Sequence, residues 1–232
     1  MLPDISGIII IAGNYGSGKS ETAVNLAAVS RRAGKRVKIT DLDLVNPYFR
    51  SREAQKPLAD LGVEVVLPDR KYMQADLPIL TSAVADMIKN PAQVTILDAG
   101  GDDAGVTVLA ALADVLKKSH VKLLQVINPL RPFTNDVQGC LKMKAQIEAA
   151  AKLPVTGLIC NANLLDETTP QIIYDGYNLV TRVSEATGLN IEFITASTRL
   201  LPQLDPERIL CPILPIDRLL AQLWCEEGRD SR

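Results

Sequence analysis

Residues 7–28 read GIIIIAGNYGSGKSETAVNLAA, an apolar run followed by a glycine-rich turn and by apolar residues at helical spacing. The turn satisfies the pattern G-x-x-x-x-G-K-[ST] through Gly13, Gly18, Lys19 and Ser20. Glycines tolerate positive φ, so the backbone N–H groups of such a turn can point inward around phosphate oxygens. The N-terminus of the following helix adds partial positive charge directed at the same anion. The stretch therefore predicts a strand, a phosphate-binding loop and a helix in direct succession.

We expect this loop to bind a nucleotide together with Mg²⁺. Lys19 would reach the β and γ phosphates, and the Ser20 hydroxyl would ligate the metal. The residues expected to bind the nucleotide are Gly13, Asn14, Tyr15, Gly16, Ser17, Gly18, Lys19, Ser20 and Glu21. A glycine-rich turn without a ligand is a poor alternative, because a plain turn after a buried strand rarely combines several glycines with a lysine.

Short runs rich in Val, Ile and Leu alternate with helical stretches along the rest of the chain. The predicted strands are residues 7–12, 36–41, 63–67, 93–98, 121–127, 154–160 and 190–195. Helices are expected at about residues 18–33, 77–89, 104–118, 134–152, 168–187 and 215–226. Nearly continuous apolar strands are typical of a parallel sheet that is buried on both faces. The alternation predicts an α/β fold with a three-layer, doubly wound, mostly parallel sheet, in a single domain over residues 1–232.

Composition and charge narrow the possible partners. The 232 residues are 47% hydrophobic and carry a formal net charge of -2, so no global positive field favours binding to nucleic acid or to an anionic membrane. The first apolar run, Ile8 to Ala12, is too short for a signal peptide or a membrane helix. We expect a cytoplasmic protein without a nucleic-acid or membrane partner.

Acidic residues stand at the ends of two predicted strands. Asp41 and Asp43 lie at the end of the segment GKRVKITDLD, and Asp98 ends the strand in VTILDAGG. Ligands of open parallel sheets bind at the carboxyl ends of the strands, so Asp98 is expected beside the phosphate loop. Its carboxylate can hold a water of a Mg²⁺ shell, because Mg²⁺ combines one or two carboxylates with waters and phosphates.

These segments resemble the MinD/ParA branch of the P-loop proteins, the CobQ/CobB/MinD/ParA nucleotide-binding domains. The resemblance begins with the glycine-rich loop and GKRVKITDLD, and it continues through VTILDAGG, LLQVINPLRPFTNDV and VTGLICNANL. It covers about residues 7–215, and its early motifs are more specific than its later ones. The resemblance implies a P-loop fold with a nucleotide and Mg²⁺ at the carboxyl edge of the sheet.

The resemblance also implies roles for further residues. In the family, the aspartate at the position of Asp43 orients the attacking water, and the one at Asp41 supports the metal shell with Ser20 and Asp98. Asn161 would hydrogen-bond the adenine edge. The guanine-specific pattern N-K-x-D is absent, because residues 161–166 read NANLLD. Adenine is therefore favoured, and ATP and Mg²⁺ are the expected cofactors.

Asn14 is the residue at which the chain departs from the family. Related proteins carry a signature lysine at this position, and that lysine reaches across a dimer to the developing phosphate charge on the partner's nucleotide. Asn14 can donate a hydrogen bond but brings no cation. Three outcomes stay open: slow hydrolysis, a cation from elsewhere such as Arg50 or Arg52, or activation by another protein.

The sequence as a whole favours a Mg²⁺-dependent ATPase that acts as a nucleotide-dependent switch. Its expected partners are ATP or ADP, a second copy of the chain in a nucleotide-dependent homodimer, and an unidentified protein. One alternative is a small-molecule kinase or ATP-dependent ligase resembling the dethiobiotin and cobyrinate synthesis enzymes. Another is a regulatory module that binds nucleotide without hydrolysing it, which the neutral Asn14 favours.

Overall fold

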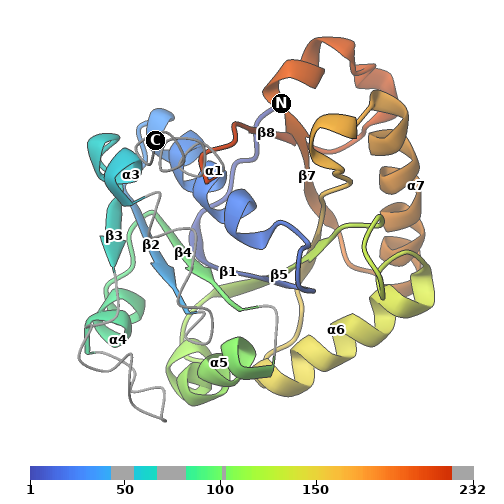
Figure 1. The fold of residues 1–232 in the computed structure, drawn as a ribbon. Helices are drawn as coiled ribbons and strands as arrows, with labels where there is room; N and C mark the ends of the chain where they lie inside the picture. The colour runs from blue at the N-terminus through green and yellow to red at the C-terminus, as the bar shows by residue number, and fades with distance from the viewer. Residues whose placement is uncertain (43–54, 67–81, 101–102, 221–232) are drawn as a thin grey trace, which may run out of the picture.

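The computed structural model of the chain describes residues 1–42, 55–66, 82–100 and 103–220. Within these residues, an eight-stranded sheet that is parallel throughout runs through the middle of the molecule (Figure 1). The strand order is β3-β2-β4-β1-β5-β6-β7-β8. The strands are β1 (Gly7–Gly13), β2 (Val37–Asp41), β3 (Glu64–Val66), β4 (Val94–Asp98), β5 (Val121–Ile127), β6 (Gly157–Cys160), β7 (Ile191–Ser197) and β8 (Ile213–Ile216).

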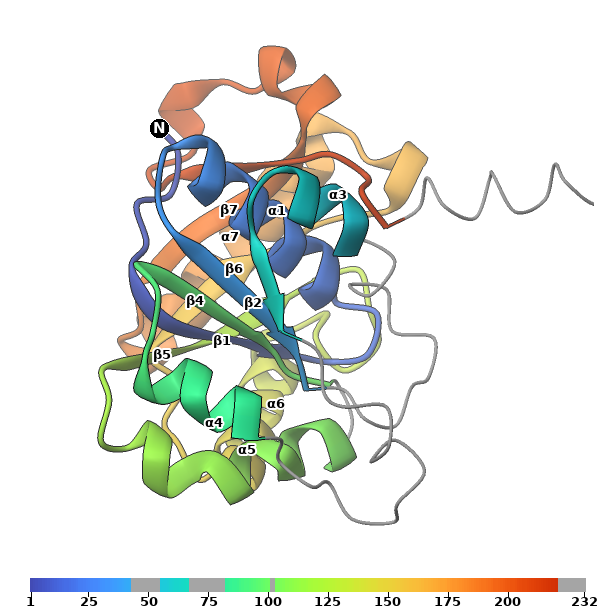
Figure 2. The same cartoon turned by 90° about the vertical axis from the view of Figure 1, so that its left-hand side faces the viewer.

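Helices cover both faces of this sheet (Figures 1 and 2). They are α1 (Lys19–Arg32), α3 (Gln55–Asp60), α4 (Ser82–Lys89), α5 (Asp103–Leu116), α6 (Val137–Ala151) and α7 (Pro170–Thr187). The short 3-10 helices are η2 (Leu165–Glu167), η3 (Thr198–Gln203) and η4 (Pro206–Arg208). Helices α1 and α3 pack on one face, whereas α4, α5, α6 and α7 pack on the other.

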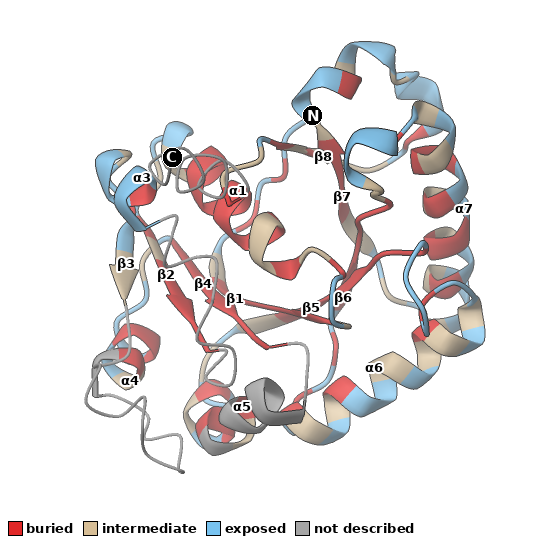
Figure 3. Cartoon of the chain, in the orientation of Figure 1, coloured by how far each residue is buried: buried red, intermediate tan, exposed pale blue. Residues whose placement is uncertain are grey.

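The isoleucines of β1 show why the fold has three layers. Ile9 and Ile11 belong to the apolar cluster that includes α1, and Ile8 and Ile10 belong to the cluster on the opposite face. All four side chains are buried, and Figure 3 shows the same burial along the central strands. Because successive side chains of a strand point to opposite faces, a continuous apolar run suits only a sheet covered on both sides.

The predicted α/β architecture with a doubly wound sheet is confirmed, and the seven predicted strands are all present with shifts at their ends. The prediction of a helix from residue 215 was wrong, because residues 213–216 form strand β8 and residues 217–220 are not helical. This strand was not predicted because the segment contains Pro212 and Pro215. Among the strands that the structure describes, β8 pairs only with β7, and an edge strand tolerates proline because one side needs no N–H donor.

Further differences concern helices. Helix α3 was not predicted, and α6 begins at Val137, three residues later than expected. Asp136 fixes that start, since its carboxylate accepts a 2.7 Å hydrogen bond from the Gly139 N–H. None of the helices in the described part of the chain is long and apolar enough to cross a bilayer.

The strand order places the carboxyl ends of three strands beside the first loop. Strand β1 lies between β4 and β5, and the loop that follows β1 leads directly into α1. The register pairs Ile11 of β1 with Asp98 of β4, and Asp98 in turn with Asp41 of β2. The two aspartates therefore end neighbouring strands on the edge of the sheet where such folds bind ligands.

The core makes a quantitative prediction at Phe193. This side chain of β7 is fully buried in the cluster that α1 covers, so truncation to alanine leaves a cavity as well as losing apolar burial. We expect Phe193→Ala to lower the free energy of unfolding by about 3–5 kcal/mol in urea denaturation. The matched control is Phe133→Ala, because the Phe133 side chain is 73% exposed and its loss should leave stability nearly unchanged. Equal midpoints for the two variants would contradict the burial of Phe193.

Candidate functional site

The loop between β1 and α1 has the backbone that its glycines predict. Gly16 has φ +71° and Gly18 has φ +87°, both in the left-handed region. Gly18 is the residue that precedes the first turn of α1, and no side chain there caps the helix. The first N–H groups of α1 therefore stay available to an anion that lies in the loop.

Asn161, which follows β6, supports the loop through hydrogen bonds. Its Nδ2 donates a 2.6 Å hydrogen bond to the Ser17 carbonyl, and its Oδ1 accepts a 2.5 Å hydrogen bond from the Thr195 hydroxyl of β7. A β-carbon on Gly18 would overlap the Asn161 amide nitrogen. Gly18 is thus required by its backbone conformation and also by the close approach of Asn161.

Asn14 supports the same loop from the other side. Its Nδ2 donates to the Pro132 carbonyl at 2.9 Å, and its Oδ1 accepts from the Tyr15 N–H at 2.7 Å. The Asn14 carbonyl accepts a 3.2 Å hydrogen bond from the Lys19 Nζ. The lysine is thus folded over its own loop, and the amide of Asn14 joins that loop to the segment after β5.

Two buried carboxylates lie at the carboxyl edge of the sheet next to this loop. Asp41 and Asp98 are each only 1% exposed, at positions that the register of β2 and β4 pairs. Among the described residues, no group of three or more His, Cys, Asp and Glu side chains could hold a metal ion. A pair of carboxylates that leaves the remaining positions to waters and phosphates fits Mg²⁺ rather than a metal held by protein ligands alone.

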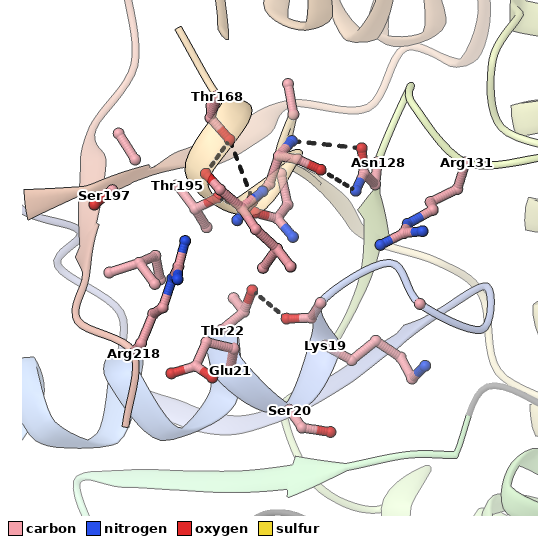
Figure 4. Close-up of a pocket in the computed structure, with 18 of the residues that line it drawn as sticks. Lys19, Ser20, Glu21, Thr22, Asn128, Arg131, Thr168, Thr195, Ser197 and Arg218 are labelled. Carbon is pink, nitrogen blue, oxygen red and sulfur yellow. Dashed lines mark hydrogen bonds between the residues drawn. The ribbon is translucent and has the colours of Figure 1, made fainter. Parts of the chain in front are cut away.

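A cavity of about 580 Å³ opens above the loop (Figure 4). Seven of the residues predicted to bind the nucleotide or metal line it together, namely Tyr15, Gly16, Gly18, Lys19, Ser20, Glu21 and Asn161. Asp43 lies outside the described residues, as do Arg50 and Arg52.

The cavity also has walls for which the sequence did not predict a role. They come from the end of β7 and from the segments after β5, β6 and β8, and their polar residues include Asn128, Arg131, Thr168, Ser197 and Arg218. Asn128 could have been identified from the sequence, because it directly follows a predicted strand. Arg218 could not have been identified in this way, because it fell within a predicted helix, whereas residues 217–220 are not helical.

One end of the cavity is bordered by an ion pair. The Arg218 guanidinium makes two hydrogen bonds to the Asp166 carboxylate, of 3.1 and 2.8 Å, and Arg199 Nη1 lies 3.6 Å from an oxygen of the same carboxylate. The hydrogen bond from Arg218 holds the pKa of Asp166 below its ordinary value. Asp166 is therefore a charged group whose acceptor positions are largely engaged by arginine.

Helix α1 holds the chain segment that carries Arg218. Asn25 forms two 3.0 Å hydrogen bonds with the backbone N–H and C=O of Asp217. One carboxylate oxygen of Glu21 accepts from the Leu219 N–H at 2.8 Å. Glu21, which was predicted to bind nucleotide, thus lines the cavity and also fixes the backbone after β8.

The loop, the parallel sheet and the paired aspartates define a P-loop nucleotide-binding domain. The family model for the CobQ/CobB/MinD/ParA nucleotide binding domain matches residues 8–173, from the first strand into α7. The chain belongs to this family, as its resemblance in sequence predicted. No curated protein matches the chain.

Solved structures with the same fold include two FtsY proteins. The signal recognition particle receptor FtsY from Elizabethkingia anophelis aligns with a TM-score of 0.59 and 21% identity, over 87% of this chain and 61% of that one. The cell division protein FtsY from Thermotoga maritima gives 0.58 and 24%, over 84% and 63%. FlhF complexed with GMPPNP and Mg²⁺ gives 0.51 and 18%, over 84% and 67%. The chain thus spans less than two thirds of either FtsY structure, and the likeness concerns the fold.

The contact between Gly18 and Asn161 predicts the effect of substituting Gly18, and Gly34 provides the control. Gly18 and Gly34 both have positive φ, but a β-carbon on Gly34 would meet no atom within 4 Å. We expect Gly18→Ala and Gly34→Ala to share a backbone cost of about 1 kcal/mol, and only Gly18→Ala to displace Asn161 as well. Binding of fluorescent ATP and GTP analogues should therefore weaken at least about tenfold in Gly18→Ala alone, a change that corresponds to 1.4 kcal/mol. Unchanged binding in Gly18→Ala would refute the steric requirement.

Proposed function

We propose that the chain is a Mg²⁺-dependent ATPase whose nucleotide state acts as a switch. The observation that carries this proposal is the phosphate loop, with Lys19, Ser20 and the uncapped start of α1 beside one cavity. Buried Asp41 and Asp98 at the adjoining strand ends support a Mg²⁺ site. Family membership supports nucleotide binding in general.

The proposed mechanism divides the work among the residues of the loop and the strand ends. Lys19 would exchange its 3.2 Å hydrogen bond to the Asn14 carbonyl for the β and γ phosphates. The Ser20 hydroxyl would ligate Mg²⁺, and Asp41 and Asp98 would hold waters of its shell. When bound, Mg²⁺ neutralises charge on the phosphates. Asp43 would orient the attacking water, as expected from the resemblance.

The choice of adenine rests on the segment that follows β6. Recognition of guanine by an N-K-x-D segment needs a carboxylate that accepts hydrogen bonds from the base. Here Asp166, the acidic residue nearest to that role in NANLLD, makes two hydrogen bonds to Arg218. GTP is the alternative, and it is favoured by structural relatives whose solved structures hold guanine nucleotides, such as FlhF complexed with GMPPNP and Mg²⁺ and FtsY in complex with GDP.

The switch would act through surfaces beside the phosphate loop. Tyr15 of the loop is 78% exposed, and Phe133 on the neighbouring segment is also exposed. Exposed aromatic residues of this kind are enriched at protein interfaces. A second copy of the chain and an unidentified protein are the proposed partners, and ATP would favour their docking relative to ADP.

Turnover tests the assignment of Lys19 and Asp43. We expect steady phosphate release from ATP with Mg²⁺, faster than from GTP at equal concentration, because Asp166 is engaged by Arg218. Lys19→Ala should abolish both binding and release. Asp43→Ala should bind ATP normally and lose at least about 100-fold in turnover, the usual contribution of a group that activates the nucleophile.

The control for turnover is Lys142→Ala, which removes an exposed cation of α6 outside the cavity and should behave as the unmodified protein. Intact turnover in Asp43→Ala would show that another group positions the water. Failure of the unmodified protein to bind either nucleotide would overturn the proposed function. Binding without any release would instead favour the regulatory module that does not hydrolyse ATP.

Sedimentation tests the switch separately from catalysis. We expect a larger sedimentation coefficient with a slowly hydrolysed ATP analogue than with ADP, because the proposed homodimer depends on the γ phosphate. Lys19→Ala should sediment as the ADP form under both conditions. Identical coefficients with the two nucleotides would contradict nucleotide-dependent dimerisation while leaving nucleotide binding intact.

A further inference from the structure

We propose that Arg131, on the segment after β5, contacts the terminal phosphate groups of a nucleoside triphosphate held by the loop of the same chain. The proposal rests on the proposed nucleotide-binding function. It assigns a cation to the site in cis, at a residue for which the sequence predicted no role. Figure 4 shows the Arg131 side chain reaching from the segment after β5 toward the phosphate loop that carries Lys19.

The backbone that carries Arg131 is fixed by hydrogen bonds within its own turn. The Arg131 N–H donates to the Asn128 carbonyl at 3.1 Å, and the Leu130 N–H donates to Asn128 Oδ1 at 3.1 Å. The hydroxyl of Thr134 donates to the same Asn128 carbonyl at 2.8 Å. Asn128 and Thr134 are both buried. The arginine thus stands on a turn that its own chain holds in place, which limits where the guanidinium can go.

This turn is also attached to the phosphate loop. Pro132, the next residue after Arg131, accepts the 2.9 Å hydrogen bond from the Asn14 side chain, which in turn bonds to the Tyr15 N–H. The spacing between the arginine and the loop is therefore set by a direct bond between the two segments. The neutral Asn14 brings no cation itself, but it holds in place the segment that does.

The guanidinium lies against the middle of the loop. A β-carbon built on Gly16 would be 3.5 Å from the Arg131 Nε and 3.8 Å from its Cζ. Arg131 and Gly16 line the same cavity as Lys19. In the described part of the chain, no carboxylate pairs with this guanidinium. A planar group with five N–H donors beside a phosphate cradle suits the recognition of phosphate oxygens.

Lys19 and Arg131 approach the loop from different elements. Lys19 starts α1, whereas Arg131 comes from the segment after β5, so together they can contact a bound phosphate chain from two sides. Charge-assisted bonds to phosphate are stronger when the anion carries more charge. The contribution of Arg131 should therefore be larger for a triphosphate than for a diphosphate, and it should need no second copy of the chain.

The experiment compares Arg131→Ala, Arg131→Lys and the unmodified full chain by titration with ATP, ADP, GTP and GDP in the presence of Mg²⁺. We expect Arg131→Ala to lose about 10- to 100-fold in affinity for the triphosphate, the usual range for one charged hydrogen-bonding group. Affinity for the diphosphate should change much less. Arg131→Lys should recover part of the loss, because it keeps the charge but not the planar fork.

The matched control is Arg182→Ala, which removes an exposed arginine of α7 outside the cavity and should bind as the unmodified chain does. Equal affinities for Arg131→Ala and Arg182→Ala would overturn the proposal, provided that the unmodified chain binds and Lys19→Ala does not. An equal loss for triphosphate and diphosphate would also overturn it, since the terminal phosphate would not be the contact. If the unmodified chain binds no nucleotide, the proposed function fails first. Urea unfolding of each variant shows that the comparison is between folded proteins.

Discussion

The hydrogen bond from Asn161 to the Ser17 carbonyl is the contact on which the geometry of the site depends. It brings the end of β6 against the phosphate loop so closely that position 18 has no room for a β-carbon. Through the Thr195 hydroxyl the same side chain is joined to β7. Because α1 begins one residue after Gly18, the direction of the helix N-terminus follows from this contact. A single buried amide thus links β6 and β7 to the loop that precedes the N-terminus of α1.

The loop is held from its other side by a second asparagine. Asn14 joins the loop to the Pro132 carbonyl, so hydrogen bonds attach the loop to the segment after β5 and to the segment after β6. A loop fixed in this way has little conformational freedom left to lose when a phosphate binds, which is the basis of preorganised electrostatic sites. Asn14, which the resemblance places at the position of the signature lysine, therefore has a structural role in this chain, because its amide bridges two segments.

The parts of this site that could be predicted are those whose residues are contiguous in the sequence. Four isoleucines followed by G-x-x-x-x-G-K-S were enough to predict a buried strand, a loop and a helix, because burial and backbone conformation are set locally. The hydrogen bonds that support the loop could not be predicted, because Asn14 and Pro132 are 118 residues apart and Ser17 and Asn161 are 144 residues apart. Strand β8 was missed for a different reason. Its prolines argue against a strand unless one knows that it lies at the edge of the sheet.

At the far end of the cavity, side chains are likewise engaged in hydrogen bonds that fix the surrounding backbone. Glu21 and Asn25 of α1 hold the backbone of residues 217–219, and this backbone presents Arg218 to Asp166. A guanine edge offers N–H groups that a carboxylate accepts well, but this carboxylate already accepts two hydrogen bonds from Arg218 and lies near Arg199. Adenine makes no such demand, because its edge carries both a donor and acceptors that neutral side chains can satisfy. The ion pair at this end of the cavity is thus the physical basis of the proposed preference for ATP.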